Sequence, residues 1–304
     1  MRIAAVLNRD GGTLKTTDLD AYCGFLADTF AEQGHELDCR ITAGPQIMNE
    51  INAAFGDGGI EVVLAGGGDG TISCASGIAW RHKKPIGVIP AGTMNMFARS
   101  LGVPLDIHQA AHALASGKPA SCDIASANHQ PFVYQFSVGL HPHIIRSRER
   151  YDYRSRLGKI RASLRAIIDG LRSPPVFPVQ ISWDGNEIEV EVSSIAVSNN
   201  RYGEGHLPHT DDLTGGELGI YFAAPVREGN GVKMLADVAL GTWRNNPDIT
   251  EITARDVTLT FPRLRRDAKA VIDGELINLE RTIELTSHSG QLLVLKPQPE
   301  ASPA

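Results

Sequence analysis

The sequence has few cysteines and no long apolar run, and both absences narrow the class of protein. Its 304 residues include four cysteines, scattered along the chain without a CxxC pair. This spacing argues against a disulfide framework or a zinc cluster and suits a reducing cytosol. No apolar stretch approaches the ~18 residues that a membrane span requires. We therefore expect a cytoplasmic protein that can still bind a membrane surface.

Neither the charge nor the first residues indicate nucleic acid binding or export. The formal net charge is −6, which gives no general attraction to nucleic acid. The opening segment "MRIAAVL" is predicted to be a strand rather than a signal peptide. The sequence contains no internal repeat and no GK[ST] segment of the Walker type, and residues 298–304 are expected to form a disordered tail.

The first 121 residues alternate between strand patterns and helix patterns. Apolar runs such as "RIAAVL", "ELDCRIT", "EVVLAG" and "PIGVIPAG" are separated by segments with apolar residues at helical spacing. Repeated strand–helix units predict a parallel sheet covered by helices on both faces. We therefore expect a doubly wound α/β nucleotide-binding domain over residues 1–121, with ligands at the carboxyl ends of its strands.

From residue 122 the apolar period changes to two. Segments such as "FVYQFSVG", "IEVEVSSIAVS" and "GELGIYFAA" alternate in hydrophobicity and are separated by Asp-Gly, Asn-Gly and Gly-Gly turns. This pattern predicts an antiparallel β-sandwich over residues 122–297. One helical segment at about residues 154–171 interrupts it, and the last strand can return to the first domain.

A glycine-rich loop follows the third predicted strand. Residues 64–71 read "LAGGGDGT" and precede a segment that suits a helix beginning near Thr71. Glycines allow a phosphate to approach the backbone, and a helix N-terminus favours negative charge. The alternative is an ordinary tight turn between a strand and a helix.

Two sequence blocks together carry a specific resemblance. The loop "GGGDGT" is followed by "PIGVIPAGTMNMFARSLGVP" at residues 85–104, and this pair closely resembles the diacylglycerol kinase catalytic-domain family. The superfamily also includes sphingosine kinases and NAD kinases. The resemblance continues through "LNRDGG", "CDIA", "VSNNRYGEGHLP" and "VIDGE", over about residues 2–297. It implies ATP- and Mg²⁺-dependent phosphorylation of a lipid hydroxyl, with diacylglycerol as the leading acceptor.

The resemblance also implies where ATP and Mg²⁺ bind. Backbone N–H groups of the glycine loop can hold phosphates. The Asp69 carboxylate would repel a phosphate, but it can bind Mg²⁺, which neutralises the phosphate charge. Asp123, in "CDIA", is the second residue expected in the metal network. The residues expected at the nucleotide are Asn8, Asp10, Gly11, Gly12, Thr42, Gly67, Gly68, Asp69, Gly70, Thr71, Gly92, Thr93 and Asn95.

The "VIDGE" block is expected to supply the catalytic carboxylates. Asp273 or Glu275 would accept the proton of the lipid hydroxyl, and the pattern does not choose between them. The alternative is structural, because Asp-Gly between two alternating runs is also a common hairpin turn.

Four positions depart from the family pattern. Cys74 and Met96 stand where the family commonly has acidic residues, His141 replaces the aspartate of "GxD", and Gly215 replaces that of an Asp-Gly pair. Two other functions therefore stay open. One is an NAD kinase-like enzyme, although no glutamate follows the asparagine pair in "VSNNRYGEG". The other is a non-catalytic nucleotide- or lipid-binding regulator, which Cys74 and Met96 favour.

A basic amphipathic segment is the candidate for membrane contact. It runs from Arg146 to Arg165 and contains eight basic and two acidic residues. Such a segment beside a lipid-kinase cleft could dock on anionic lipid, at ~1 kcal/mol per surface cation. The alternative is a helix that covers the sandwich and has a solvated polar face. No nucleic acid partner is expected, and the sequence leaves the oligomeric state open, a dimer included.

Overall fold

The computed structural model describes residues 1–149, 174–203, 210–225, 237 and 240–298. The helices are α1 (Leu19–Ala31), α2 (Ile47–Gly56), α3 (Asp69–His82), α4 (Met96–Ser100), α5 (Ile107–Ala115) and α6 (Leu140–Glu149). The strands of the first half are β1 (Arg2–Asn8), β2 (Glu36–Thr42), β3 (Val62–Gly67), β4 (Ile86–Pro90), β5 (Lys118–Ala127), β6 (Gln130–Phe132) and β7 (Gln135–Gly139). Those of the second half are β8 (Phe177–Trp183), β9 (Asn186–Val192), β10 (Ser194–Ser198), β11 (Leu218–Ala223), β12 (Ile249–Ala254), β13 (Asp256–Thr260), β14 (Lys269–Ile272), β15 (Glu275–Asn278) and β16 (Thr282–Lys296).

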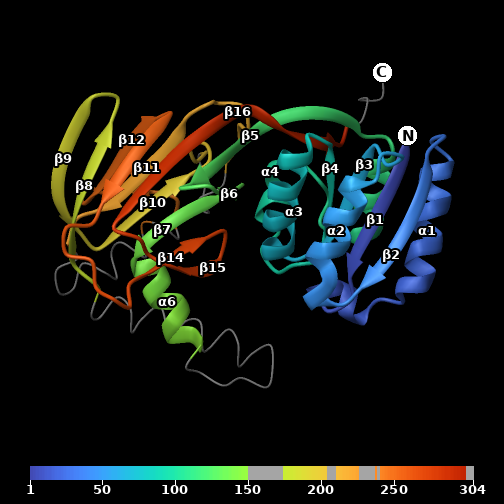
Figure 1. Ribbon diagram of the computed structural model, residues 1–304, viewed down its shortest axis with the longest axis horizontal. Coiled ribbons are helices and arrows are strands. Elements are labelled where there is room, and N and C mark those ends of the chain that lie inside the picture. Colours follow the sequence, from blue (N-terminus) through green and yellow to red (C-terminus); the bar gives the residue numbers. More distant parts are fainter. Residues whose placement is uncertain (150–173, 204–209, 226–236, 238–239, 299–304) are drawn as a thin grey trace.

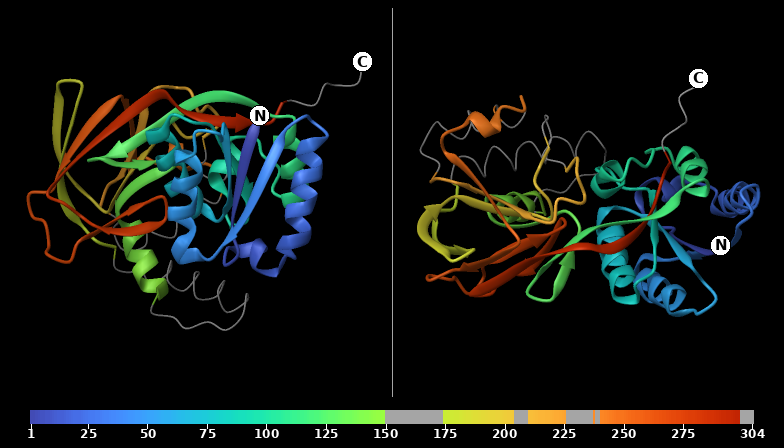
Figure 2. Two further views of the ribbon diagram at one scale, coloured as in Figure 1. Left: turned by 45° about the vertical axis from the view of Figure 1, so that its right-hand side comes forward. Right: turned by 90° about the horizontal axis from the view of Figure 1, so that it is seen from above.

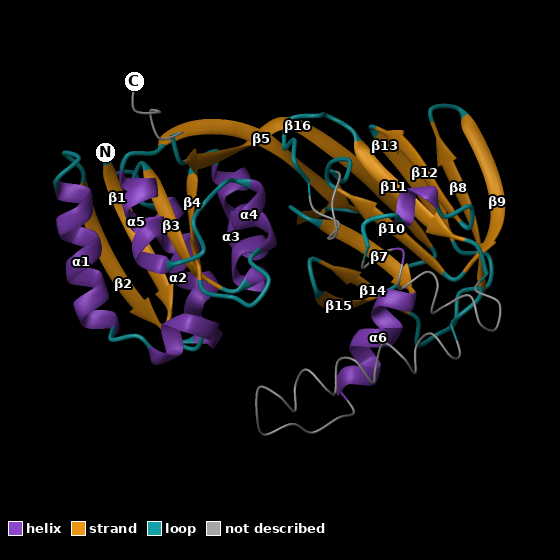
Figure 3. Ribbon diagram, turned by 180° about the vertical axis from the view of Figure 1, so that it is seen from behind, coloured by secondary structure: helices purple, strands orange, loops and turns teal. Residues whose placement is uncertain are grey.

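The amino-terminal domain is a parallel sheet between two layers of helices. Its strands follow the order β2-β1-β3-β4, with α1 packed beside α5 and α2 beside α3 (Figures 1 and 3). The central strands β3 and β4 are buried along their whole length, as expected for strands covered on both faces. The strand order reverses between β1 and β3, which is where ligands bind in sheets of this kind.

A single sheet runs through both domains. The long strand β16 pairs in parallel with β4 through Val294 and Ile86, and along most of its length it pairs with β5. Its first half also pairs with β13 in the carboxyl-terminal domain. Figures 1 and 2 show β5 and β16 passing together from one domain to the other. The domains are therefore joined by paired strands rather than by a single linker.

The carboxyl-terminal domain is a sandwich. Its second sheet is antiparallel, in the order β12-β11-β10-β7-β14-β15. Alternate residues such as Phe136 and Val138 on β7 are buried in one core with Val257 and Leu259 of the long sheet, which follows from the period of two. The predicted fold class, a doubly wound α/β domain followed by an antiparallel β-sandwich, is confirmed.

The cysteines differ from the prediction. Cys23 on α1 and Cys39 on β2 form a disulfide with a Cα–Cα distance of 5.7 Å, whereas Cys74 and Cys122 are free. This one disulfide was not expected from the scattered cysteines. The two residues are 16 positions apart, and only the packing of α1 against β2 brings them together.

Some predicted features lie outside the described residues. Helix α6 begins at Leu140, directly after β7, and the helix predicted at residues 154–171 falls in a part of the chain that the structure does not describe. The same holds for most of the basic segment and for the tail from residue 299. None of the helices that the structure describes has the length and hydropathy needed to cross a membrane.

Candidate active site

The glycine loop lies at the carboxyl end of β3, where four strand-to-helix loops meet. Strand β3 ends at Gly67 and α3 begins at Asp69, two residues earlier than predicted. The loops after β1, β2 and β4 reach the same edge of the sheet. The first helical N–H groups of α3 have no partner within their own helix, so they can bind an anion there.

Glycines allow these loops to touch. A Cβ on Gly12, which has a φ of +28°, would lie 1.7 Å from the carbonyl oxygen of Ala91. A Cβ on Gly92 would lie 2.9 Å from the Cα of Gly68. Gly11 likewise faces Gly67, with 3.5 Å between its Cβ position and that Cα. Side chains at these positions would fill the space in which a nucleotide phosphate could approach the backbone.

Polar groups from β1 and β2 border this space. Asn8 pairs with Thr42 at the ends of their strands. The side-chain oxygen of Asn8 accepts a hydrogen bond of 3.0 Å from the N–H of Asp10, and its amide nitrogen lies 3.5 Å from the Thr71 hydroxyl. The Asp10 carboxylate accepts from the N–H of Gly44 at 2.8 Å. The predicted nucleotide residues of β1 and β2 are thus brought beside the glycine loop.

Asp69 connects the glycine loop to the loop after β4. Its carboxylate accepts hydrogen bonds from the N–H groups of Asn95 at 3.1 Å and Met96 at 2.8 Å. Asn95 has a φ of +50°, and its side-chain oxygen accepts from the N–H of Gly92 at 2.8 Å. Thr93 is exposed in the same loop. Asp69 therefore fixes the start of α4, a role that the sequence did not predict.

Asp273 forms the hairpin turn of one alternative, and it also lines the cavity beside the glycine loop. Asp273 and Gly274 have φ values of +45° and +92° between β14 and β15, as in the tight turns that favour Asp-Gly. The carboxylate is 8% exposed. It accepts four hydrogen bonds, from Ser73 Oγ at 2.6 Å and from the N–H groups of Val133 at 2.9 Å, Tyr134 at 2.9 Å and Gln135 at 2.8 Å.

Burial decides the direction of the Asp273 pKa. Removal from water raises the pKa of this carboxyl, and the hydrogen bonds from Ser73 and the backbone oppose the rise without cancelling it. Burial also raises the pKa of the Cys74 thiol, with smaller contributions from Glu275 and Asp273. Cys74 is thus a thiol in the electrostatic field of the Glu275 and Asp273 carboxylates.

Glu275 lies over the glycine loop. A Cβ on Gly70 would be 2.8 Å from the Oε1 atom of Glu275, and the glutamate is exposed. In the described part of the chain its carboxylate has no hydrogen-bond or ion-pair partner. The structure thus brings together the "GGGDGT" and "VIDGE" blocks, which are 200 residues apart in sequence at Ser73 and Asp273.

Asp123 has different neighbours from those predicted for a metal ligand. Its carboxylate is fully buried and accepts from Asn200 Nδ2 at 2.6 Å, Gly216 N at 2.6 Å and Gly290 N at 2.8 Å. Three N–H donors therefore hold this carboxylate in place. Gly216 stands beside the Gly215 that replaces the aspartate of the family, so this region of the chain is held by Asp123 itself.

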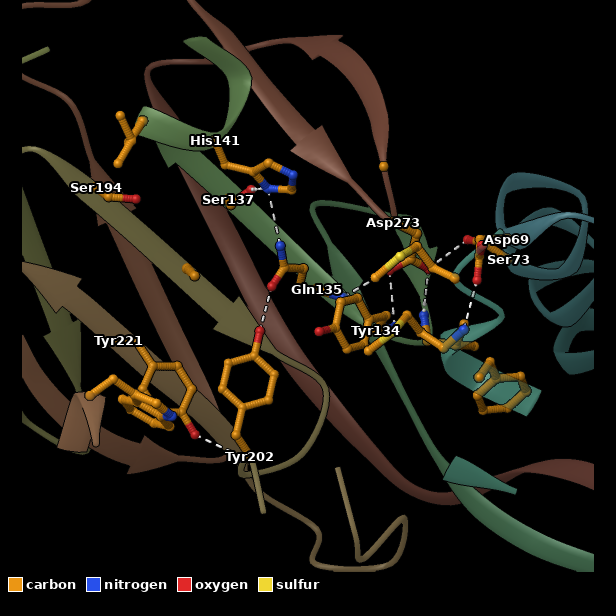
Figure 4. A pocket seen from close by; sticks show the side chains of 18 of the residues that line it. Asp69, Ser73, Tyr134, Gln135, Ser137, His141, Ser194, Tyr202, Tyr221 and Asp273 are labelled. Atoms are coloured by element: carbon orange, nitrogen blue, oxygen red, sulfur yellow. Dashed lines mark hydrogen bonds between the residues drawn. The ribbon is translucent and has the colours of Figure 1, made fainter. Parts of the chain in front are cut away.

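An apolar cavity opens from the Asp273 turn into the sandwich domain. It has a volume of about 590 Å³ and lies between β7, β10, β11 and the start of α4. Figure 4 shows Asp69, Ser73 and Asp273 at one end, and Tyr202, Tyr221 and His141 farther along. Met96 lines this cavity, so the residue that departs from the family pattern contributes apolar wall rather than a metal ligand.

Sequence reasoning missed several polar residues of the site. Ser73, Gln135, Ser137 and Tyr202 line the cavity and were not singled out. Alternation along β7 contains the signal for two of them, because Gln135 and Ser137 share the face opposite the core residue Phe136. The hydrogen bond from Ser73 to Asp273 had no sequence signal, since it depends on how the two domains meet.

The amino-terminal domain is similar to a known family of protein domains. The family model described as "Diacylglycerol kinase catalytic domain" matches residues 2–127. Residues 2–127 are therefore similar to the catalytic domain of diacylglycerol kinases. The match covers the domain that carries the glycine loop and ends at the last residue of β5, and the sandwich follows it.

Individual relatives extend the likeness into the sandwich. A diacylglycerol kinase of Bacillus subtilis (strain 168) is 27% identical over 271 residues, which cover 84% of this chain and 87% of that protein. One from Staphylococcus aureus (strain JH9) is 27% identical over 241 residues, 74% of each chain. An uncharacterized protein of Synechocystis is 27% identical over 242 residues, and the chain covers 53% of its length.

Solved structures share the fold. A diacylglycerol kinase from Bacillus anthracis str. Sterne superposes with a TM-score of 0.72 at 18% identity, covering 97% of this chain and 96% of that one. Another chain from the same organism reaches a TM-score of 0.76 at 21% identity and covers 97% and 96%. At these identities the superpositions concern the fold alone.

The described residues do not form a ready metal cage. No group of three or more His, Cys, Asp or Glu side chains in the described part of the chain is arranged to hold a metal ion. Magnesium commonly binds through one or two carboxylates together with substrate phosphates and water. Asp69, which has one backbone donor on each oxygen, fits this arrangement because each oxygen can accept a second interaction.

Proposed function

We propose that the protein is an ATP- and Mg²⁺-dependent lipid kinase that phosphorylates a hydroxyl of diacylglycerol or a related lipid. One observation carries the proposal. The hairpin with Asp273 and Glu275 lies across the glycine loop, and a largely apolar cavity begins at the same turn. A phosphate site that opens into an apolar cavity suits an acceptor with a hydroxyl at one end and hydrocarbon at the other.

The α/β domain would hold ATP. The glycine loop and the N-terminus of α3 would bind its phosphates through backbone N–H groups, with Asn8, Asp10 and Thr42 bordering the nucleotide. Asp69 would bind Mg²⁺ jointly with the phosphates. When bound, the metal would neutralise charge that builds up during phosphoryl transfer. This role is needed because the chain has no Walker lysine.

Glu275 would accept the proton of the lipid hydroxyl, and Asp273 would be the positioning residue. The two oxygens of Asp273 already accept four hydrogen bonds, which occupies the acceptor sites of a carboxylate. Glu275 has no such partner in the described chain and faces Gly70. A general base must lie within hydrogen-bond reach of the hydroxyl and have a free lone pair.

Contact with a membrane surface is part of the proposal. A lipid acceptor has to be taken from a bilayer, and the basic segment 146–165 is the candidate for that contact. Of its side chains the structure describes Arg146, which lies on α6 and approaches Asp267 with 3.9 Å between Nη1 and Oδ2. Charge-neutralising variants in this segment would lower binding to anionic vesicles if the proposal holds.

Transfer of ³²P from γ-labelled ATP tests the function. The acceptors are diacylglycerol, ceramide, a sphingoid base, monoacylglycerol and phosphatidylglycerol in mixed micelles with Mg²⁺, and NAD is included. Label on a lipid would support the kinase and name its substrate. Label on NAD alone would assign the protein to the NAD kinase-like alternative. ATP binding without transfer to any acceptor would favour the non-catalytic regulator.

A further inference from the structure

The cavity contains a chain of polar side chains that the transfer site does not use. The Tyr202 hydroxyl donates to Oε1 of Gln135. The amide nitrogen of Gln135 lies 3.1 Å from Nδ1 of His141, and the Ser137 hydroxyl lies 2.7 Å from the same nitrogen. Figure 4 shows these four residues along one wall, away from the Asp69 end.

The hydrogen bonds around Gln135 indicate which ring nitrogen of His141 carries a hydrogen. Because Oε1 of Gln135 accepts from Tyr202, its amide nitrogen faces His141, and an amide nitrogen can only donate. We therefore assign Nδ1 of His141 as the acceptor and the hydrogen of the neutral ring to Nε2. Burial lowers the pKa of His141, which favours this neutral form.

The free N–H of His141 is a donor in apolar surroundings. Nε2 has no hydrogen-bond partner among the residues that the structure describes, and His141 lines the cavity. The cavity is also lined by apolar side chains such as Leu140 and Ala196 and by Ser194, whose hydroxyl lies 3.5 Å from the carbonyl oxygen of Val138. The carboxylates of the cavity, Asp69 and Asp273, lie at its other end. The Nε2–H of His141 can therefore donate to an uncharged oxygen of a bound ligand. A ligand ammonium group could not accept this hydrogen bond, because it is itself a donor.

We propose that His141 is a specificity-determining residue, whose Nε2–H donates a hydrogen bond to a carbonyl oxygen of the acceptor lipid. The inference rests on the proposed function, because the acceptor is the lipid whose hydroxyl lies at Glu275. Gln135 connects the two ends, since its backbone N–H donates to Asp273 at 2.8 Å while its side chain donates to His141. Ser137 is two residues farther along β7, ~7 Å. The hydroxyl and the carbonyl would thus belong to one head group.

An ester-linked and an ether-linked lipid separate this role from apolar binding. Diacylglycerol and dialkylglycerol with the same chains share the hydroxyl and the hydrocarbon, and the dialkyl lipid lacks the carbonyl. Their equilibrium binding in mixed micelles is measured with wild type, His141→Phe and His141→Gln. The matched control is His143→Phe, an exposed position on the same helix.

Wild type and His143→Phe should bind the ester lipid up to about tenfold more tightly than the ether lipid, as expected for one added hydrogen bond. His141→Phe should bind the two lipids equally. His141→Gln should regain part of the preference, since its amide nitrogen can donate. Equal binding by wild type, or a preference that survives in His141→Phe, would overturn the inference.

Phosphoryl transfer measured in the same samples keeps the two claims apart. An ester preference that depends on His141, with transfer to the ester lipid, supports both. The same preference without transfer to either lipid supports carbonyl recognition by His141 and contradicts the kinase function. Transfer that proceeds equally well to both lipids contradicts the role of His141 and leaves the kinase function supported.

Discussion

At the scale of single residues, the site depends on glycines that have no side chain and on ionisable side chains that are buried. Gly12 and Gly92 bring backbones together where side chains would collide. Asp273 and His141 are ionisable groups held away from water, so each has a pKa displaced toward its neutral form. Each effect predicts how a substitution at the residue should change the stability of the protein.

Gly12→Ala should destabilise the protein far more than Gly34→Ala. Both glycines have a positive φ, but a Cβ on Gly12 would meet the carbonyl of Ala91 at 1.7 Å, whereas a Cβ on Gly34 has no atom within 4 Å. We expect a loss of about 1 kcal/mol for Gly34→Ala from the left-handed backbone, and roughly 2 kcal/mol or more for Gly12→Ala from added overpacking. Urea unfolding measures both. Equal losses would contradict the packing of these loops.

His141 should make stability depend on pH below neutrality. Burial lowers its pKa in the folded state, whereas the unfolded value is about 6.5. Between the folded value and ~6.5 the unfolded chain binds more protons, so this contribution is complete above that window and is lost as the pH falls through it. Urea unfolding from pH 7.5 to pH 5 should show a steeper loss in wild type than in His141→Gln. Parallel curves would contradict a buried, neutral His141.

At the scale of secondary-structure elements, the sequence predicted the pattern well and the contacts poorly. Burial of one face of a helix or strand produces a periodic pattern of apolar residues in the sequence. This pattern predicted the alternation of strand and helix up to Ala115 and the period of two along β7. No sequence pattern indicated the start of α6 at Leu140 or the Cys23–Cys39 disulfide, because both depend on elements that are neighbours only in the folded structure. In the site, "GGGDGT" and "VIDGE" were identified by type, whereas the partners of Asp123 required the packed sandwich.

Helix α3 joins the two halves of the site, and Ser73→Ala tests this connection. The variant removes one of the four donors to Asp273. We expect transfer to fall by about tenfold, the size of one hydrogen bond to a charged group, while the chain stays folded. Ser76→Ala is the control, since its hydroxyl bonds to Ile72 in the same helix. If Ser73→Ala changes the unfolding free energy and leaves kcat intact, Asp273 has a structural role alone.

The disulfide between α1 and β2 should contribute to stability. It closes a loop between residues 16 positions apart, for which loop-closure entropy predicts about 3 kcal/mol. Urea unfolding with and without a thiol reductant measures this. The Cys23→Ala, Cys39→Ala double variant should be less stable and insensitive to the reductant. Reductant sensitivity that survives in the double variant would contradict this assignment.

At the scale of the whole molecule, the active site exists only where the two domains meet. The α/β domain provides the glycine loop and Asp69, and the sandwich provides the Asp273 turn and the cavity. The Ser73–Asp273 hydrogen bond joins the domains apart from the shared strands β5 and β16, and Trp80 Nε1 donates to Gln291 Oε1 on β16 at 3.1 Å. Under the proposed function, phosphate binding and acceptor binding would belong to different domains.

The most direct test of this account is the rate of phosphoryl transfer from ATP to diacylglycerol by Glu275→Gln. The substitution keeps size and removes the proton acceptor over the glycine loop, so kcat should fall by about 10²- to 10⁴-fold. ATP affinity and the unfolding free energy should stay near the wild-type values, because Glu275 is exposed. A Glu275→Gln enzyme that transfers phosphate at the wild-type rate would contradict the central claim.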